Sequence, residues 1–291
     1  MALWLAGCSP QPNPGREEDS LTSGRITIVC APEASRLIER ERSVFEALYP
    51  AAHIGIRVGS SREAIRALFA AECPLAVITR ELDVEERAAA VRGGLALAGY
   101  RFARDAVVAV VHPGNPIQNI AIEQLRRIYG GEITSWSELG GARAPIVPVV
   151  QPMDLDLTQF FLQQVMGGSA MKARAYTAAD DSAVIERVGA DRDAIGFVTL
   201  AWANRGARAL AVAALVGMPY LRPDPEAVYK GTYPLTRFYN LYARESGPQL
   251  ANGFITFVTS RDGQALVERE GLVPTAVPVR FVRRSPMMST H

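Results

Sequence analysis

The sequence has few cysteines, little net charge and no long apolar run. Three cysteines are too few for a disulfide framework. The 31 Lys and Arg residues nearly balance the 30 Asp and Glu residues, for a net charge of +1. This balance argues against nucleic acid as a partner and against broad attraction to an anionic membrane surface. No stretch after the N-terminus reaches the roughly 18 apolar residues of a spanning helix.

Enzyme and metal signatures are also missing. There is no Gly-x-Ser-x-Gly elbow, P-loop, His-Glu-x-x-His helix or dinucleotide-binding glycine pattern. The three histidines do not lie beside Cys or carboxylates at metal-ligand spacing. Asp154 and Asp156 lie on one loop, too close to flank a substrate as an acid–base pair. We therefore expect no catalysis, no cofactor and no metal.

Length and periodicity predict an α/β protein of about two domains. In the first block, β-rich segments alternate with helical ones, which favours right-handed crossovers and parallel strands. The expected strands are 26–30, 54–58, 75–79 and 106–111, and the expected helices 35–48, 61–71 and 84–91. A second block has expected helices 122–129, 157–166 and 182–188 and strands 145–150 and 194–198; strands 209–212 and 238–242 and helices 248–259 and 261–269 follow.

The first eight residues end in Leu5-Ala6-Gly7-Cys8, which resembles the bacterial lipobox. A polar, proline-rich segment follows, as a tether would. This pattern predicts lipidation of Cys8 and a periplasmic or cell-surface, lipid-anchored protein. The apolar residues before the motif are fewer than the roughly 7–15 of a signal peptide, so a chance match is the alternative.

The other two cysteines are expected to stay unpaired. Cys30 ends one expected strand and Cys73 precedes another. In parallel strands these positions lie at opposite ends, roughly 15 Å apart. A disulfide requires Cα atoms within about 7 Å. Both residues are therefore interpreted as buried, small hydrophobic residues.

Six short motifs occur in a familiar order. They are Phe45-Glu-Ala-Leu-Tyr-Pro50, Ile133-Thr-Ser-Trp136 with Leu139-Gly-Gly141, Ala194-Ile-Gly-Phe-Val198, Tyr233-Pro-Leu-Thr-Arg237, Ser260-Arg-Asp-Gly-Gln264 and Gly271-Leu-Val-Pro274. The match that they mark covers most of residues 25–276. On these residues the chain resembles the phosphate-binding proteins of bacterial phosphate ABC transporters, which are type II periplasmic solute-binding proteins.

The resemblance implies a two-lobed type II periplasmic binding protein fold. Each lobe would be a mixed, mostly parallel sheet flanked by helices, and the lobes would close on a ligand by a hinge motion. The first lobe would take residues 25–108 and 207–282, and the second 109–206. Residues 1–24 would be a signal remnant and tether, and 283–291 a loose tail.

Three helix starts are the expected anion-binding elements, because free N–H groups and the helix dipole favour negative charge there. They are residues 31–35, 59–62 and 154–158. Ser60 and Glu63 fit a capping box, and Asp156 with Gln159 fits a similar cap. For Asp156, a cap and a ligand contact are both open. The pair Asp180-Asp181 is interpreted as a further cap.

Several positions depart from the family pattern. Ala31-Pro32-Glu33 stands where the first loop normally carries small hydroxyl residues, and Pro74 falls near the family's acceptor Asp. Gln151 stands near the family's Arg, and Asp156-Leu157-Thr158 replaces Ser-Gly-Thr. A dianion would lose charge-assisted hydrogen bonds here, so weakened phosphate binding is expected.

The resemblance places ten residues at the ligand, with Arg62 and Arg80 as partial substitutes for the lost cation. A solvated face for Arg62 and a surface or hinge ion pair for Arg80 are the alternatives. The candidates are Glu33, Gly59, Ser60, Ser61, Arg62, Thr79, Arg80, Gln151, Asp156 and Thr158.

The resemblance implies a monomeric lipoprotein that captures phosphate or a related small oxyanion for an ABC permease. It would touch the membrane only through its anchor. The alternative is the same fold with another ligand or none, acting as a sensor or partner-binding module. Fold analogy alone does not separate the two.

Overall fold

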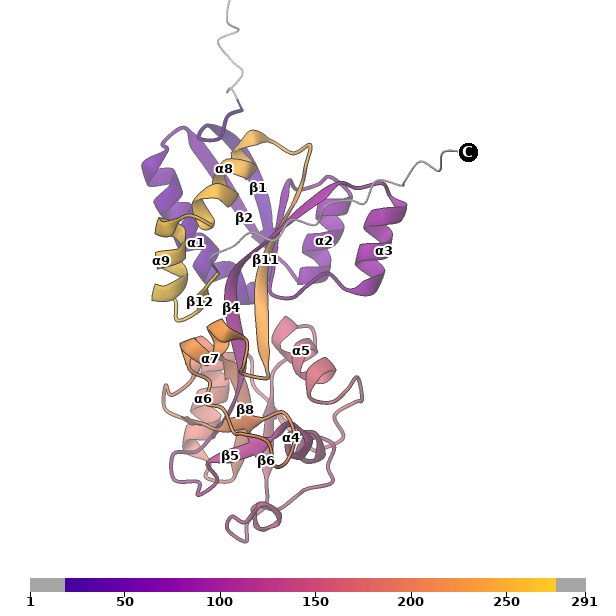
Figure 1. Cartoon of the computed structure of the whole chain (residues 1–291), viewed down its shortest axis with the longest axis vertical. Coiled ribbons are helices and arrows are strands. Elements are labelled where there is room, and N and C mark those ends of the chain that lie inside the picture. Colours follow the sequence, from indigo (N-terminus) through magenta and orange to yellow (C-terminus); the bar gives the residue numbers. More distant parts are fainter. Residues whose placement is uncertain (1–18, 276–291) are drawn as a thin grey trace, which may run out of the picture.

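The computed structural model of the chain describes residues 19–275. Two lobes lie one above the other and are joined by two long neighbouring strands, β4 (Leu97–Val111) and β11 (Thr236–Arg244) (Figure 1). These strands pair antiparallel, and β4 continues beyond the pairing into the lower lobe, where it meets β8 (Ala194–Thr199). One sheet therefore runs through both lobes in the order β2-β1-β3-β11-β4-β8-β6-β7.

The upper lobe is built on parallel strands β1 (Gly24–Cys30), β2 (Ala52–Val58) and β3 (Leu75–Ile78). A core containing Phe45 and Phe254 packs one face of this sheet, and a second core containing Leu68 packs the other. The helices are α1 (Pro32–Leu48), α8 (Gln249–Val258) and α9 (Arg261–Arg269) on the first side, and α2 (Ser61–Phe69) and α3 (Val84–Arg92) on the second (Figure 1). The short strand β12 (Val273–Pro274) pairs with β4.

The lower lobe has a single continuous core, in which the Phe161 and Phe197 rings stack at 4.1 Å between centroids. Its strands are β6 (Val147–Val150), β7 (Tyr176–Thr177), β8, β9 (Arg208–Ala209), and the separate pair β5 (Asn119–Ala121) and β10 (Ala211–Ala213). Its helices are α4 (Ile122–Tyr129), α5 (Asp156–Gln164), α6 (Asp181–Ala190), α7 (Pro225–Lys230) and the 3₁₀ turns η1 (Trp136–Leu139) and η2 (Leu200–Trp202).

A buried ion pair fixes the strands where they cross between the lobes. Asp105 on β4 lies directly opposite Arg237 on β11, with Arg237 Nε 2.8 Å from Asp105 Oδ2. Both side chains are at most 1% exposed. The other oxygen, Asp105 Oδ1, accepts a hydrogen bond from the Leu200 amide at 3.0 Å. One carboxylate thus ties both strands to the lower lobe.

The structure changes the expected division into lobes. The expected division gives residues 207–282 to the first lobe, but β10 pairs with β5, and Val212, Val228 and Tyr233 belong to the lower core. The chain therefore re-enters the upper lobe through β11, well after residue 207. The expected strand 106–111 is only the last part of β4, whose earlier part also carries the charged residues Arg101, Arg104 and Asp105.

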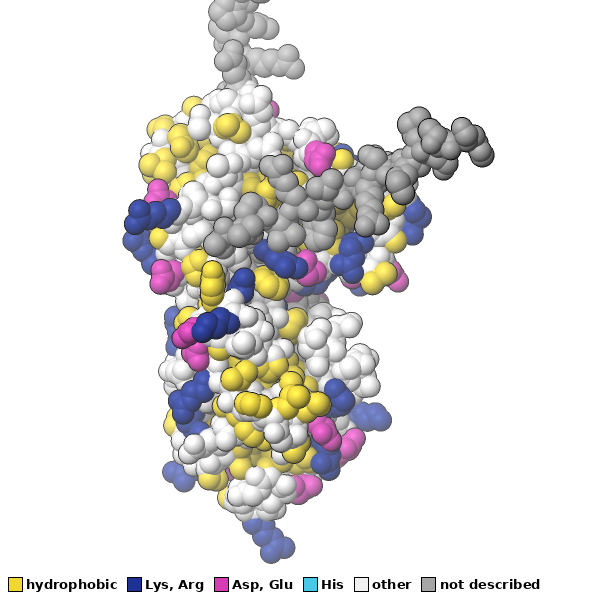
Figure 2. Space-filling view, viewed as in Figure 1, with side chains coloured by type: hydrophobic (Ala, Val, Ile, Leu, Met, Phe, Trp, Pro, Cys, Tyr) yellow, Lys and Arg dark blue, Asp and Glu magenta, His cyan; other side chains and the backbone are white. Residues whose placement is uncertain are grey.

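Most expected elements are present, and α4 and α9 have the expected ends. Cys30 and Cys73 are free and buried, as predicted. Charged side chains of both signs are scattered over the face shown in Figure 2, in keeping with the balanced composition. Within residues 19–275, no helix is long and apolar enough to cross a membrane. The predicted lipid site, Cys8, lies outside the described residues.

Candidate ligand site between the lobes

A cluster of polar side chains forms where α5 of the lower lobe meets the upper sheet. Ser61 begins α2, Thr79 follows the carboxyl end of β3, and Asp156 begins α5. Ser61, Thr79 and Asp156 are 2%, 0% and 6% exposed, so their polar atoms must be satisfied by one another. The carboxyl ends of parallel strands are the usual ligand position in α/β proteins.

The Asp156 carboxylate is the acceptor at the centre of this cluster. Its Oδ2 accepts hydrogen bonds from Ser61 Oγ, from Thr79 Oγ1 at 2.8 Å and from the Thr79 amide at 3.3 Å. Its Oδ1 lies 3.6 Å from Arg80 Nε. We call these upper-lobe groups, the Ser61 hydroxyl, the Thr79 hydroxyl and amide, and the Arg80 guanidinium, the oxyanion cradle.

A second carboxylate crosses between the lobes in the opposite direction. Glu33, in the first turn of α1, accepts a hydrogen bond through Oε1 from the Leu157 amide at 3.1 Å. That amide is one of the free donors at the start of α5, where negative charge is favoured. Glu33 Oε2 is buried and has no hydrogen-bond partner among the described residues.

Glu33 is electrostatically coupled to the cluster. Burial raises its pKa above the ordinary glutamate value, and the nearby Asp156 charge raises it further. Arg237 and the backbone hydrogen bond from Leu157 act in the opposite direction. The Asp156 charge therefore lies close enough to influence the ionisation of Glu33.

Arg80 contributes to two ion pairs. Its NH1 and NH2 bind both carboxylate oxygens of Glu86 at 2.7 Å, and its Nε faces Asp156. The Asn240 side chain on β11 donates to the Arg80 carbonyl at 2.8 Å, which fixes the backbone at the end of β3. The expected ion pair of Arg80 is present, and the guanidinium also reaches the cradle.

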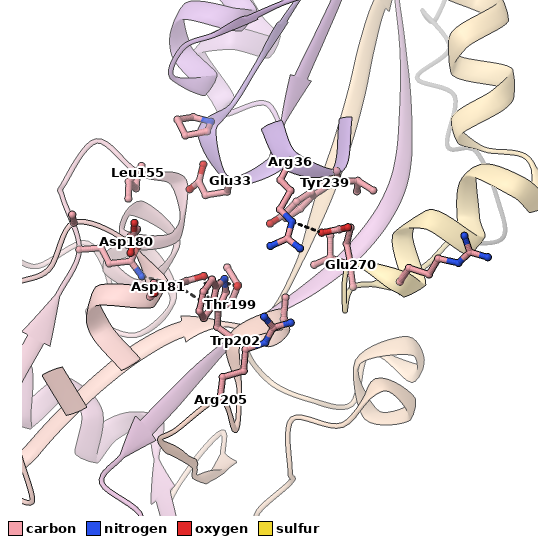
Figure 3. A pocket seen from close by; sticks show the side chains of 18 residues that line it. Glu33, Arg36, Leu155, Asp180, Asp181, Thr199, Trp202, Arg205, Tyr239 and Glu270 are labelled. Atoms are coloured by element: carbon pink, nitrogen blue, oxygen red, sulfur yellow. Dashed lines mark hydrogen bonds and ion pairs between the residues drawn. The ribbon is translucent and has the colours of Figure 1, made fainter. Parts of the chain in front are cut away.

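A cavity of about 430 Å³ opens on the other side of Glu33, between α1, α6 and η2 (Figure 3). Its lining includes Glu33, Arg36, Asp181, Trp202, Arg205 and Tyr239. Figure 3 shows Arg36 bonded to Glu270 on the upper side and Asp181 bonded to Thr199 on the lower side. The cavity thus has charges of both signs on its walls.

Asp181 is held by several hydrogen bonds in this cavity. It accepts from Thr199 Oγ1 at 2.6 Å and from Gln151 Nε2 at 2.7 Å. Burial raises its pKa, while the Thr199 and Gln151 hydrogen bonds lower it. The side-chain amide of Gln151, which stands near the family's arginine position, therefore donates to this acid.

The structure brings together Glu33, Ser61, Thr79, Arg80 and Asp156 of the ten candidates. The other five candidates have different surroundings, and the contact of Gln151 with Asp181 is given above. The Ser60 hydroxyl bonds with Glu63 in the capping box, Arg62 is exposed, the Gly59 amide donates to the Cys30 carbonyl at 3.0 Å, and Thr158 Oγ1 donates to the Gln151 carbonyl at 3.3 Å.

The cap predictions have mixed outcomes. The Ser60–Glu63 box is confirmed, and Asp180 caps α6 by accepting from the Ala183 amide at 2.9 Å. Of the two alternatives for Asp156, the cap is not formed: Leu155 occupies the N-cap position of α5 without a side-chain hydrogen bond. The Asp156 carboxylate turns outward because stronger donors face it across the cleft.

Sequence reasoning did not find three structural features of the site region. These are the Asp105–Arg237 pair, the Asp181–Thr199 contact and the Asn240 bond to Arg80. All three join residues distant in sequence, and the only available signal was charge inside apolar strand segments. Among residues 19–275, no group of three or more His, Cys, Asp or Glu could hold a metal ion.

Comparisons with known proteins give a consistent result. A family model described as a PBP superfamily domain matches residues 15–262. The chain is 22% identical over 283 residues to the phosphate-binding protein PstS of Pseudomonas aeruginosa, covering 91% of this chain and 88% of that protein. It is 25% identical over 254 residues to PstS of Bacillus subtilis, covering 87% and 81%.

The solved structures agree on the fold. An ABC-type phosphate transport receptor from Vibrio cholerae superposes with a TM-score of 0.75 at 22% identity, covering 86% of this chain and 100% of that one. The two-lobed type II periplasmic binding protein fold predicted from the sequence is therefore confirmed, as is the resemblance to phosphate-binding proteins of ABC transporters.

Proposed function

The chain belongs to the PBP superfamily, and from that membership we propose that it is an extracytoplasmic solute-binding protein that captures phosphate or a related oxyanion for an ABC permease. The oxyanion cradle is the observation that carries the proposal. Two hydroxyls, one amide and one guanidinium converge on a single carboxylate, which is the donor set that an anionic oxygen needs.

The names of the relatives support the choice of ligand. PstS of Pseudomonas aeruginosa and the Vibrio cholerae receptor are both described as phosphate proteins. The oxyanion cradle lies at the carboxyl end of β3 and the start of α2, in a fold similar to that of the Vibrio cholerae receptor. Phosphate is therefore the first oxyanion to test, with sulfate as the matched alternative.

The affinity is expected to be low. Gln151 carries no charge where the family has arginine, and it is bound to Asp181. The Asp156 carboxylate adds negative charge at the cradle. Losing two charge-assisted hydrogen bonds costs about 3–6 kcal/mol, or roughly a hundred- to ten-thousandfold in affinity.

A different ligand is the second candidate function. The cavity beside Glu33 has walls of both charges and two aromatic side chains, Trp202 and Tyr239. A solute with both a cationic and an anionic group would suit these walls better than a dianion would. In that case the protein would act as a sensor or carrier for another solute.

Attachment and assembly complete the proposal. We assign lipid anchoring to Cys8, contact with the permease to the two lobes, and a monomeric state to the protein. Catalysis has no place in it, because the relatives are transport substrate-binding proteins.

Calorimetric titration of the purified protein with phosphate and sulfate tests the proposal. We expect phosphate to bind with millimolar affinity, and Ser61→Ala to remove that binding because it deletes a buried cradle donor. Arg62→Ala is the control, since Arg62 is exposed on the same helix. Absence of phosphate and sulfate binding at tens of millimolar, roughly −3 kcal/mol or weaker, would favour the second candidate.

A further inference from the structure

The two carboxylates that cross between the lobes form a reciprocal arrangement. Asp156 belongs to the lower lobe and binds donors of the upper lobe, whereas Glu33 belongs to the upper lobe and binds an amide of the lower lobe. Asp156 and Leu157 are consecutive residues at the start of α5. Both contacts therefore act at one helix end, which Figure 1 places directly below α2.

We infer that Asp156 is a built-in ligand of the oxyanion cradle: its carboxylate, together with Glu33, holds the two lobes closed and must be displaced by any solute that uses the cradle. Asp156 thereby determines which solutes bind. The part that concerns solutes rests on the proposed function, whereas the closure of the lobes does not.

The bonding of Asp156 supports this role over that of a local structural acid. Its carboxylate makes no cap with its own helix, since the N-cap residue Leu155 has no side-chain bond to α5. All four contacts instead reach Ser61, Thr79 and Arg80, which lie 76 to 95 residues earlier in the chain. A residue needed only to start α5 would not have to reach across the cleft.

The energetics of the cradle favour an anion at this position. The Ser61 and Thr79 groups are buried while the lobes are together, so emptying the cradle without opening the lobes would leave desolvated donors without acceptors. Each hydrogen bond to a charged group is stronger than a neutral one. The Asp156 carboxylate meets this demand intramolecularly, at an effective concentration that a dilute solute does not reach.

The same contact determines the class of solute. An entering oxyanion must replace the carboxylate in the cradle and then lie beside the displaced Asp156. Like charges at this separation repel, and most strongly for a dianion. Neutralising Asp156 should therefore strengthen phosphate binding, although it removes a contact between the lobes.

Small-angle X-ray scattering of Asp156→Ala and Asp156→Asn tests the closure. Both variants lose the charge, and Ala also loses the acceptor, so the radius of gyration should increase from wild type to Asn to Ala. Asp154→Asn is the matched control, because this exposed acid lies two residues away. Far-UV circular dichroism and thermal melts establish that each variant is folded, and if Ala fails to fold, Asn gives the same direction.

An unchanged radius of gyration in the folded Asp156 variants overturns the inference, whatever their affinity for phosphate. An increase shared by Asp154→Asn overturns it as well. An increase confined to the Asp156 variants supports it. Calorimetry on the same samples then tests the ligand. A phosphate affinity of Asp156→Ala at least about tenfold higher than that of wild type supports the cradle as a phosphate site. If the lobes of the Asp156 variants open but no variant binds phosphate, the inference that Asp156 holds the lobes closed is supported and the proposed function is refuted.

Discussion

At the scale of single residues, Glu41 is the most unusual side chain outside the site. It lies on α1 and is fully buried, and neither carboxylate oxygen has a hydrogen-bond partner among the described residues. Burial raises its pKa from 4.5 to about 9. Glu41 is therefore protonated and neutral in the folded protein near pH 7, whereas it is ionised in the unfolded chain.

This difference predicts a pH-dependent stability. Between pH 4.5 and about 9 the folded state binds one more proton at Glu41, so the free energy of unfolding falls as pH rises through that window. The slope is at most about 1.4 kcal/mol per pH unit. Glu41→Gln removes this titration, and urea melts at several pH values should show that wild type loses stability relative to Gln as pH increases. Parallel curves for the two proteins would contradict the assignment.

At the scale of elements, the contact between α6 and β8 depends on a glycine in the Ala194-Ile-Gly-Phe-Val198 motif. A Cβ at Gly196 would lie 2.6 Å from Val184 Cγ1 and 3.2 Å from Val188 Cγ2. Both valines are buried side chains of α6. The motif residue that marks the family thus has a packing role, because it allows the helix to approach the strand.

Gly196→Ala should lower the free energy of unfolding by about 1–3 kcal/mol, the usual cost of overpacking a core. Gly55→Ala on β2 is the control, because the added Cβ approaches only the Thr27 side chain, at 3.1 Å. Denaturant melts compare the two variants. Equal stability of both would mean that α6 shifts without cost.

At the scale of the whole molecule, the proposed attachment to the membrane rests on the N-terminal sequence. We expect Cys8 to be lipidated in the protein expressed from its native start, because Leu5-Ala6-Gly7-Cys8 precedes a polar tether. Metabolic labelling with a fatty-acid probe should mark wild type and leave Cys8→Ala unmarked. Equal labelling of both would refute the anchor.

Local sequence patterns determined most of the fold. Periodicity located the longer helices and strands of both lobes, since burial of one face is readable over ten residues. It missed α7 and the short strands β5, β7 and β12. Helix starts at Ser60 and Asp180 followed from capping chemistry, which is also local. The pattern did not determine where the chain returns, because residues 208–235 join the lower core through pairing of β10 with β5, which no local signal encodes.

The candidate site also has features that local sequence patterns predict and features that depend on contacts between distant residues. The positions of four cluster residues at strand ends and helix starts could be predicted from local patterns, because they follow from where each element begins and ends; the residues are Ser61, Thr79, Arg80 and Asp156. That the Asp156 carboxylate leaves its own helix uncapped and binds the other lobe depends on the packing of the two lobes. That choice depends on the competition between donors near in sequence and donors near in space, and the buried cradle, with two hydroxyls, an amide and a guanidinium, prevails.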